Sequence, residues 1–246
     1  MSGCALVLIL GATSDIARAA ARRYAACGHA LILVARDATR LEDDAADLRL
    51  RFGGAVETRV CDLLDEASRA ALLDSLSVLP GIVLCAVGLL GDQAEAERDP
   101  ALAERIIGTN FTAPALVLGE LANRMAGRGS GVLIGISSVA GERGRASNYL
   151  YGSAKAGFTA FLSGLRARMA GRGVRVVTVK PGFVRTRMTD GLNLPAPLTA
   201  GPEEVTAAIL DAGRRGVDVV YVRPVWRLIM LVIRMLPEAV FKRVKL

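Results

Sequence analysis

Three residues have the types and the spacing needed for proton transfer to an oxygen atom: Ser138, Tyr151 and Lys155. Tyr151 and Lys155 are one helical turn apart, so on a helix the phenol and the ammonium lie side by side. A free phenol has a pKa of about 10, but an adjacent cation favours its ionised form. We therefore expect Lys155 to lower the pKa of Tyr151, Tyr151 to transfer a proton, and Ser138 to bind the oxygen of a reacting carbonyl group.

Two alternatives compete with this interpretation. A Tyr and a Lys at this spacing also occur on ordinary helices, and a hydrolase with a Ser-His pair is a rival class of enzyme. The sole histidine, His29, precedes the second predicted strand, at the amino edge of the sheet and opposite the expected site. No Cys/His cluster or acidic pattern predicts a metal site.

The elements that must position these residues alternate between strands and helices. Short apolar runs predict strands at residues 4–10, 30–35, 56–60, 82–86, 131–136, 174–179 and 217–222. Helical periodicity predicts helices at residues 16–27, 40–51, 67–76, 100–126, 151–170 and 203–215. Such a chain forms a single Rossmann-like, doubly wound α/β domain, with about seven parallel strands flanked by helices and a ligand site at their carboxyl ends.

We assign residues 1–222 to this dinucleotide-binding and catalytic domain and residues 223–246 to an amphipathic C-terminal tail. The loop at residues 189–202 is rich in turn residues and long enough to be a mobile lid over the site.

The composition argues against several other classes of protein. The formal charge of +7 comes from Lys and Arg residues spread through the predicted helices, so we expect no nucleic-acid partner. The four cysteines lack metal or disulfide spacing, and we expect Cys4, Cys27, Cys61 and Cys85 to be reduced and buried. The first residues do not form a secretory signal, which predicts a cytoplasmic protein.

The turn after the first strand is suited to bind phosphate groups. A glycine allows close approach of the backbone, and the helix that follows offers N–H groups and a positive dipole. We expect the pyrophosphate of a dinucleotide at Gly11, Thr13, Ser14, Asp15 and Ile16. A complete fingerprint has glycine at positions 15 and 17, where this chain has Asp15 and Ala17. The alternative is that Ser14 or Asp15 only caps the helix.

The end of the second strand predicts which cofactor is bound. An NAD enzyme places an acid there for the ribose 2′-hydroxyl, whereas this chain has Arg36. Because a guanidinium binds a 2′-phosphate, we predict NADP(H) rather than NAD(H); the alternative is a surface arginine beside Asp37. After the third strand we expect Asp62 and Leu63 at the adenine, where Asp62 binds the amino group or else caps the next helix.

The combination of motifs resembles the short-chain dehydrogenase/reductase family over essentially the whole chain. Ser138 lies thirteen residues before the Tyr-Gly-Ser-Ala-Lys motif at 151–155, Asn110 lies in Thr-Asn-Phe, and Pro181-Gly182 follows the sixth strand. The resemblance implies hydride transfer between nicotinamide and a carbonyl/alcohol pair in a dimer or tetramer. It implies that Asn110 supports a water that relays protons from Lys155, which also binds the nicotinamide ribose.

The resemblance also extends the expected cofactor site. It places the carboxamide end at Pro181, Gly182, Val184 and Thr186, and the end of the fourth strand at Ala86 and Gly88. The sequence departs from the family pattern at residues 85–88, Cys-Ala-Val-Gly, where Asn-Asn-Ala-Gly is frequent. This departure and the altered turn leave a second hypothesis, a non-catalytic NADP-sensing or scaffold module at a membrane.

The tail is apolar from Trp226 to Leu236 except for Arg227 and Arg234, and it is too short to span a bilayer. Basic residues follow it at 242, 243 and 245. It either lies on an anionic membrane at the inner face, packs on a neighbouring subunit, or covers its own substrate cleft. Together with residues 88–92, 140–143 and 185–188, it resembles a branch of the family that reduces a keto-pentose carried on a polyprenyl phosphate. A lipid-linked carbonyl compound is therefore one expected substrate, and a small carbonyl compound is the other.

Overall fold

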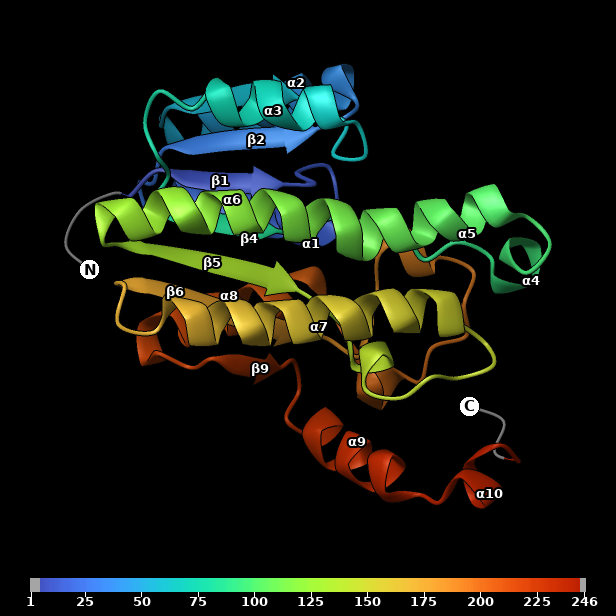
Figure 1. Cartoon of the computed structure of the whole chain (residues 1–246). Coiled ribbons are helices and arrows are strands. Elements are labelled where there is room, and N and C mark those ends of the chain that lie inside the picture. The colour runs from blue at the N-terminus through green and yellow to red at the C-terminus, as the bar shows by residue number, and fades with distance from the viewer. Residues whose placement is uncertain (1–4, 244–246) are drawn as a thin grey trace.

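A seven-stranded parallel sheet lies at the centre of the computed structural model, which describes residues 5–243 (Figure 1). The strand order is β3-β2-β1-β4-β5-β6-β9. Their bounds are β1 (Val7–Leu10), β2 (Leu31–Ala35), β3 (Val56–Val60), β4 (Ile82–Cys85), β5 (Gly131–Ile136), β6 (Val174–Lys180) and β9 (Val219–Tyr221). The predicted doubly wound α/β fold is confirmed. Because the order reverses between β1 and β4, a crevice is expected at their carboxyl ends.

Helices cover both faces of the sheet (Figure 1). One face carries α1 (Asp15–Ala26), α2 (Ala38–Phe52) and α8 (Pro202–Arg215). The other carries α3 (Glu66–Asp74), α6 (Ala113–Arg128) and α7 (Tyr149–Met169). Two hydrophobic cores result, one on each side of the sheet.

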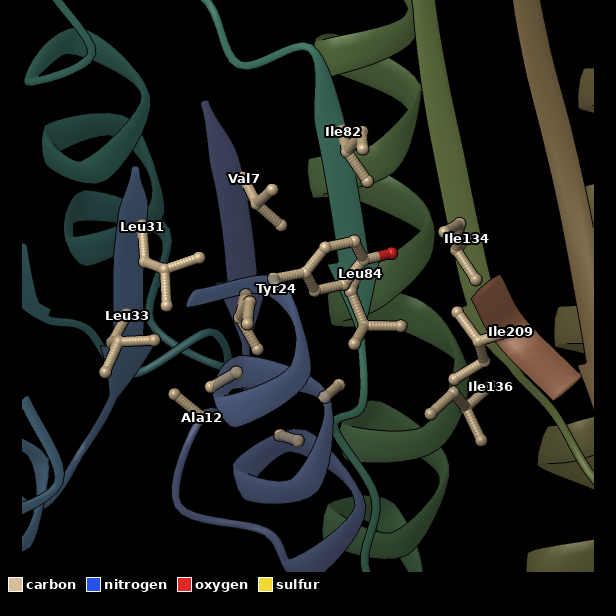
Figure 2. Packing of buried hydrophobic residues seen from close by; sticks show 14 of the residues in the cluster. Val7, Ala12, Tyr24, Leu31, Leu33, Ile82, Leu84, Ile134, Ile136 and Ile209 are labelled. Carbon is tan, nitrogen blue, oxygen red and sulfur yellow. The ribbon is translucent and has the colours of Figure 1, made fainter. Parts of the chain in front are cut away.

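The strands read as continuous apolar runs because both of their faces are buried. In β1, Ile9 enters the first core and Leu10 enters the second. Figure 2 shows the first core, in which Tyr24 of α1 and Ile209 of α8 lie on the same side of the sheet as the strand residue Leu84.

The single helix expected at residues 100–126 is interrupted. After the short α4 (Gln93–Ala96), α5 (Pro100–Ile107) leads into a π-helical turn (Gly108–Thr112), and α6 follows directly. Pro114 has no N–H and cannot close the α-helical bond to the Asn110 carbonyl, so the regular hydrogen-bond pattern cannot pass through this point. The segment is helical as predicted, but the π-helical turn, which carries Asn110, was not predicted.

The cysteines are not all buried, contrary to expectation. Cys61 and Cys85 are buried, but Cys27 is exposed because it follows the last turn of α1, beyond the residues that face the core. Cys4 lies outside the described residues. His29 contacts the Ala5 carbonyl, 2.8 Å from its Nδ1, before β1 begins, so it lies at the amino edge of the sheet as expected.

The lid region and the tail complete the fold. β7 (Phe183–Val184) pairs with β8 (Thr199–Ala200), and between them lie two 3₁₀ turns, Arg187–Thr189 and Ala196–Leu198. The tail forms α9 (Val225–Met235) and α10 (Glu238–Phe241). None of the helices within residues 5–243 has the length and apolarity needed to cross a bilayer.

One face of α9 packs on its own chain. Trp226 and Met230 are buried against Val139, in a small third core beside the main sheet. The opposite face is exposed and apolar: Val225, Leu228, Leu231, Val232 and Met235. Part of the tail therefore packs on a residue of the turn that follows Ser138.

Candidate active site

A cavity of about 520 Å³ opens where the strand order reverses. The predicted site residues that line it are Gly11, Thr13, Ser14, Asp15, Ile16, Arg36, Asp62, Leu63, Ala86, Gly88, Ser138, Tyr151, Lys155, Pro181, Gly182, Val184 and Thr186. Asn110 is the one predicted site residue that does not line it. The volume falls in the range of small-molecule sites, about 300–1,000 Å³.

The three residues singled out for proton transfer face this cavity together. Ser138 precedes the 3₁₀ turn Val139–Gly141 at the end of β5, and Tyr151 and Lys155 lie in the first turns of α7. The Ser138 hydroxyl accepts the Ala140 N–H over 3.1 Å, and its interaction with the Tyr151 phenol favours the ionised phenol. Lys155 is 3% exposed, and its Nζ donates to the Ile136 carbonyl over 3.0 Å.

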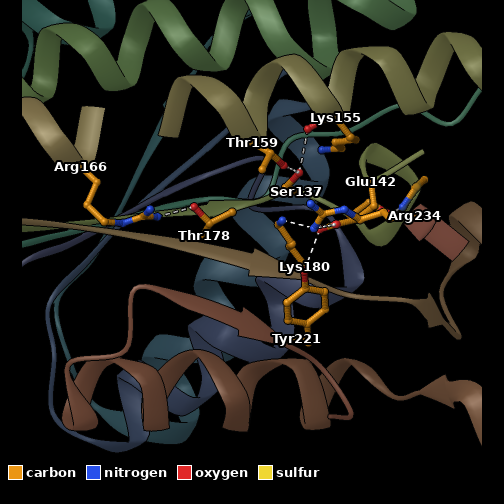
Figure 3. A network of polar contacts seen from close by, with 11 residues as sticks. Ser137, Glu142, Lys155, Thr159, Arg166, Thr178, Lys180, Tyr221 and Arg234 are labelled. Atoms are coloured by element: carbon orange, nitrogen blue, oxygen red, sulfur yellow. Dashed lines mark hydrogen bonds and ion pairs between the residues drawn. The ribbon is translucent and has the colours of Figure 1, made fainter. Parts of the chain in front are cut away.

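Two glycines allow the Ser138 turn to approach α7 this closely. A Cβ on Gly141 would lie 2.6 Å from the backbone nitrogen of Ala156, and one on Gly152 would lie 2.9 Å from the Ala140 carbonyl oxygen. Ser137 adds a polar tie, since its hydroxyl donates to the Lys155 carbonyl over 3.0 Å (Figure 3). The backbone therefore fixes the spacing between Ser138 and the Tyr-Lys pair.

Burial, rather than the neighbouring ammonium, dominates the ionisation of Tyr151. Desolvation raises the pKa of its phenol to about 12, although the interaction with Ser138 acts in the opposite direction. Burial also lowers the pKa of Lys155 to about 8, with a smaller opposite effect from Cys85. The expectation that Lys155 lowers the pKa of Tyr151 was wrong for the protein chain by itself, because Nζ is directed to the Ile136 carbonyl and lies 5.8 Å from the phenol ring centre.

The Asn110 side chain binds backbone groups and does not line the cavity. Its side-chain amide donates to the carbonyls of Leu89 and Ile106, over 2.6 and 2.8 Å, and its oxygen accepts from the Leu89 N–H. The side chain thereby ties the segment after β4 to α5. Both amide hydrogens are used in these bonds, and the Asn110 side chain is fully buried.

The turn after β1 has the shape of a phosphate cradle. Gly11 has a φ of 77°, and a Cβ there would lie 3.0 Å from the Val87 nitrogen, so both its conformation and its surroundings require glycine. Ser14 caps α1, accepting from the Ala17 N–H over 3.3 Å, which is the alternative considered for this residue. A capping serine and a cavity-lining turn coexist, and the turn fits a pyrophosphate at the helix start.

Asp15 is held by a residue that the sequence did not suggest. Arg187, two residues before the lid loop expected at 189–202, donates its backbone N–H and its Nε to the Asp15 carboxylate, over 2.7 and 2.9 Å. Its guanidinium also donates to the Thr13 carbonyl. The carboxylate that interrupts the fingerprint is therefore paired with a cation, and the lid region is joined to the phosphate turn.

The end of the cavity where adenosine is expected is basic. Arg36 and Arg40 both line it. Asp37 caps α2 by accepting the Arg40 N–H over 3.0 Å, which satisfies its carboxylate locally. Asp62 accepts the Leu64 N–H, whereas Asp65 caps α3, so the alternative that Asp62 caps this helix was wrong. Arg40 was missed from the sequence, although it lies in the first turn of α2, four residues after Arg36.

The opposite end of the cavity is built against α9. A Cβ on Gly182 would lie 1.9 Å from Cε2 of Trp226, so the indole occupies the space beside this turn. The Trp226 indole also donates to the Leu198 carbonyl over 3.1 Å and meets the Phe183 ring edge to face. The tail therefore supports both the Pro181-Gly182 turn and the lid region.

Comparisons with known proteins agree with this geometry. The family model described as short chain dehydrogenase matches residues 5–196. A protein from Mycobacterium tuberculosis named uncharacterized oxidoreductase Rv2073c is 44% identical over 245 residues, 98% of each chain. A short-chain dehydrogenase from Sphingobium yanoikuyae, solved in complex with NADPH, is 29% identical, with a TM-score of 0.83 over 95% of this chain and 97% of that one. A bulky-bulky ketone specific alcohol dehydrogenase from Comamonas testosteroni is 26% identical, with a TM-score of 0.80 over 96% of both chains.

The fold, the cavity and the family match lead to one assignment. The protein is an enzyme that uses a nicotinamide cofactor, and the seven-stranded sheet supplies the site at its carboxyl edge. This chain belongs to the short-chain dehydrogenase/reductase family of oxidoreductases.

Proposed function

We propose that this enzyme reduces a ketone or aldehyde with NADP(H), and that Ser138, Tyr151 and Lys155 carry the reaction. The observation that supports this most is that the Ser138–Tyr151 pair and Lys155 line the same cavity as the phosphate turn. A carbonyl oxygen placed at the pair would accept from both hydroxyls.

The chain's own residues would stabilise and protonate the reacting oxygen. The nicotinamide, when bound, supplies the hydride for the carbonyl carbon. Ser138 would hold the oxygen, and Tyr151 would donate its proton as the alkoxide develops. A pKa of about 12 keeps the phenol protonated near neutral pH, which suits a proton donor. Lys155 would bind the nicotinamide ribose and return a proton to Tyr151, while Asn110 would position the neighbouring backbone.

Replacement of Tyr151 by Phe tests the assignment directly. Loss of a general acid costs about 10²- to 10⁴-fold in turnover, whereas NADPH binding should remain. Tyr149→Phe is a matched control, because Tyr149 lies on the same helix but is exposed and does not line the cavity. Full activity of the Tyr151→Phe variant would refute the mechanism.

We propose NADP(H) over NAD(H) because two guanidiniums, Arg36 and Arg40, lie at the adenosine end and the nearby Asp37 is used as a helix cap. Arg36→Ala should weaken NADPH binding much more than NADH binding. A charge-assisted phosphate contact is worth about 1.5–3 kcal/mol, which corresponds to roughly ten- to hundredfold in Kd. Equal losses for both cofactors would remove the argument.

For the substrate we propose a keto-sugar carried on a polyprenyl phosphate. The exposed apolar face of α9 supports this, because Trp226 on the same helix contacts the Pro181-Gly182 turn of the cavity. A farnesyl-phosphoryl keto-pentose should then be reduced with a lower KM than its methyl-phosphoryl counterpart. Equal KM values for the two would count against a lipid-linked substrate.

We further propose that α9 lies on the inner face of an anionic membrane. Its exposed side chains Leu228 and Met235 have 63% and 75% of their surface accessible, the helix contains no acidic residue, and Arg227 and Arg234 border the apolar face. Leu228→Glu should reduce sedimentation with vesicles that contain phosphatidylglycerol. Leu50→Glu, at an exposed leucine of α2, is the control.

The same variants also test the subunit alternative. We expect a dimer or tetramer, and light scattering after gel filtration would measure it. If Leu228→Glu dissociates the oligomer and the unmodified protein does not sediment with anionic vesicles, the α9 face is a subunit contact and the membrane proposal fails.

A further inference from the structure

A buried carboxylate joins the Ser138 turn to the C-terminal helix (Figure 3). Glu142 directly follows this turn, and its side chain is 4% exposed. Its Oε1 accepts from Lys180 Nζ and, over 2.8 Å, from the Tyr221 hydroxyl. Its Oε2 lies 3.3 Å from the Arg234 guanidinium. The partners come from β6, β9 and α9, so one carboxylate holds three elements against the turn.

One of these contacts, together with a backbone hydrogen bond, places the Ser138 turn against the Pro181-Gly182 turn. Lys180 is the last residue of β6 and immediately precedes Pro181. In parallel with the Glu142–Lys180 ion pair, the Val139 N–H donates to the Pro181 carbonyl over 3.0 Å. The backbone bond and the ion pair together set the distance between the two turns that border the reacting part of the cavity.

The next residue contacts the same end of this helix. Arg143 donates to the carbonyls of Ile233 and Leu236, over 2.8 and 2.5 Å, and pairs with Glu238. Its guanidinium also lies 3.9 Å from the centre of the Phe241 ring. The two residues that follow the turn, Glu142 and Arg143, therefore both contact the C-terminal end of α9.

Stability alone is a poor explanation for this cluster. Removing two charges from water costs nearly as much as their attraction returns, and apolar residues of similar volume often stabilise such a site equally well. Burial tends to raise the pKa of Glu142, but the hydrogen bonds from Lys180 and Tyr221 outweigh it and the net pKa is lowered. Glu142 is therefore ionised at neutral pH, and a charged cluster with few alternative arrangements selects one geometry.

We propose that Glu142 is a positioning residue that couples α9 to the active site. By holding Lys180 and Arg234, it keeps the Ser138 hydroxyl at a fixed distance from the turn that borders the nicotinamide. The inference rests on the proposed function, since the reacting carbonyl has to fit between these two turns. Glu142 itself does not line the cavity and touches neither substrate nor cofactor.

Glu142→Gln tests the coupling with little change of shape. The variant, bound to NADPH, should show faster hydrogen exchange in residues 137–142 and 181–184 and unchanged exchange in α2. With phenanthrenequinone as the probe substrate, kcat should fall at least about tenfold while the Kd for NADPH stays within about twofold. Glu238→Gln, which removes the exposed partner of Arg143, is the control and should leave kcat and exchange unchanged.

A double variant separates positioning from simple loss of stability. In Glu142→Gln the Lys180 ammonium is left buried without its counter-ion, so adding Lys180→Met should recover part of the lost kcat. A purely structural role would lower the melting temperature but leave kcat per folded molecule and the local exchange unchanged, and that result would overturn the proposal. Tyr151→Phe in the same assay tests the proposed function separately: an active Tyr151→Phe variant refutes that function, whatever Glu142→Gln does.

Discussion

The Asp15–Arg187 pair makes a quantitative prediction about cofactor binding. The Arg187 Nε lies 2.9 Å from Asp15 Oδ1, and the two side chains are 47% and 21% exposed. Two unit charges at this distance attract by about 1.4 kcal/mol in water and about 6 kcal/mol at an effective dielectric constant of 20. Half-exposed pairs fall near the lower value after screening, at about 1 kcal/mol. Removing Arg187 should leave an unpaired carboxylate beside the pyrophosphate and raise the Kd for NADPH by about fivefold.

A double-mutant cycle checks this value. The Kd for NADPH is measured by fluorescence titration for the unmodified protein, Arg187→Gln, Asp15→Asn and the double variant. In the Asp15→Asn background there is no carboxylate to expose, so Arg187→Gln should change Kd by less than about twofold. Arg185→Gln is the control for loss of an exposed cation two residues away. If Arg187→Gln weakens NADPH equally in both backgrounds, Arg187 acts on the phosphates directly and the pairing argument is refuted.

Three further predictions follow from packing and ionisation. Gly141→Ala should lower the melting temperature and turnover, since overpacking against the Ala156 backbone costs about 1–3 kcal/mol. Gly127→Ala is the control, because a Cβ there meets open space. Equal melting temperatures for the two variants would contradict the reasoning. The kcat/KM for reduction should fall above pH about 8, because the pKa of Lys155 is lowered to about 8; a profile that is flat to higher pH would show that the Lys155 charge is not needed. Because the pKa of Glu142 is lowered in the folded protein, its ionisation stabilises the fold at pH values above its ordinary pKa of 4.5, and this stabilisation is lost as the pH falls. The melting temperature of Glu142→Gln should therefore fall less between neutral and acidic pH than that of the unmodified protein. An equal fall in both proteins would argue against the Lys180 contact.

The sheet could be predicted from the sequence because its signal is local. Buried parallel strands such as β4 and β5 read as uninterrupted apolar runs, and each observed strand of the central sheet coincides with a predicted run to within a few residues. The π-helical turn at Gly108–Thr112 was missed, although Pro114 marks it. The exposure of Cys27 was missed for a different reason: an apolar neighbourhood in sequence does not show where a helix ends relative to the core.

The residues of the site could be predicted only where they belong to family motifs. Ser138, Tyr151 and Lys155 could be placed together because a helix and the end of a strand fix their geometry. Arg187 and Glu142 could not be found this way, since their partners lie far along the chain and the contacts exist only after the lid region and α9 have packed. Asp15 looked like a defect of the phosphate turn when considered alone. Its partner, rather than its own position, explains why a carboxylate is tolerated there.

The ionisation of Tyr151 predicts a difference between the two directions of the reaction. Reduction needs a protonated phenol, and a pKa of about 12 supplies one throughout the neutral range. Oxidation of an alcohol needs the phenolate. At pH values below that pKa, the fraction of phenolate increases about tenfold for each unit by which the pH rises. The rate of oxidation should therefore increase steeply between pH 6 and pH 8, whereas the rate of reduction should stay nearly constant. Initial rates in both directions with the same carbonyl/alcohol pair would measure this. If oxidation were already independent of pH at pH 7, the bound cofactor would have to lower the pKa of Tyr151 by far more than burial raises it, and the phenol would not be held protonated for reduction.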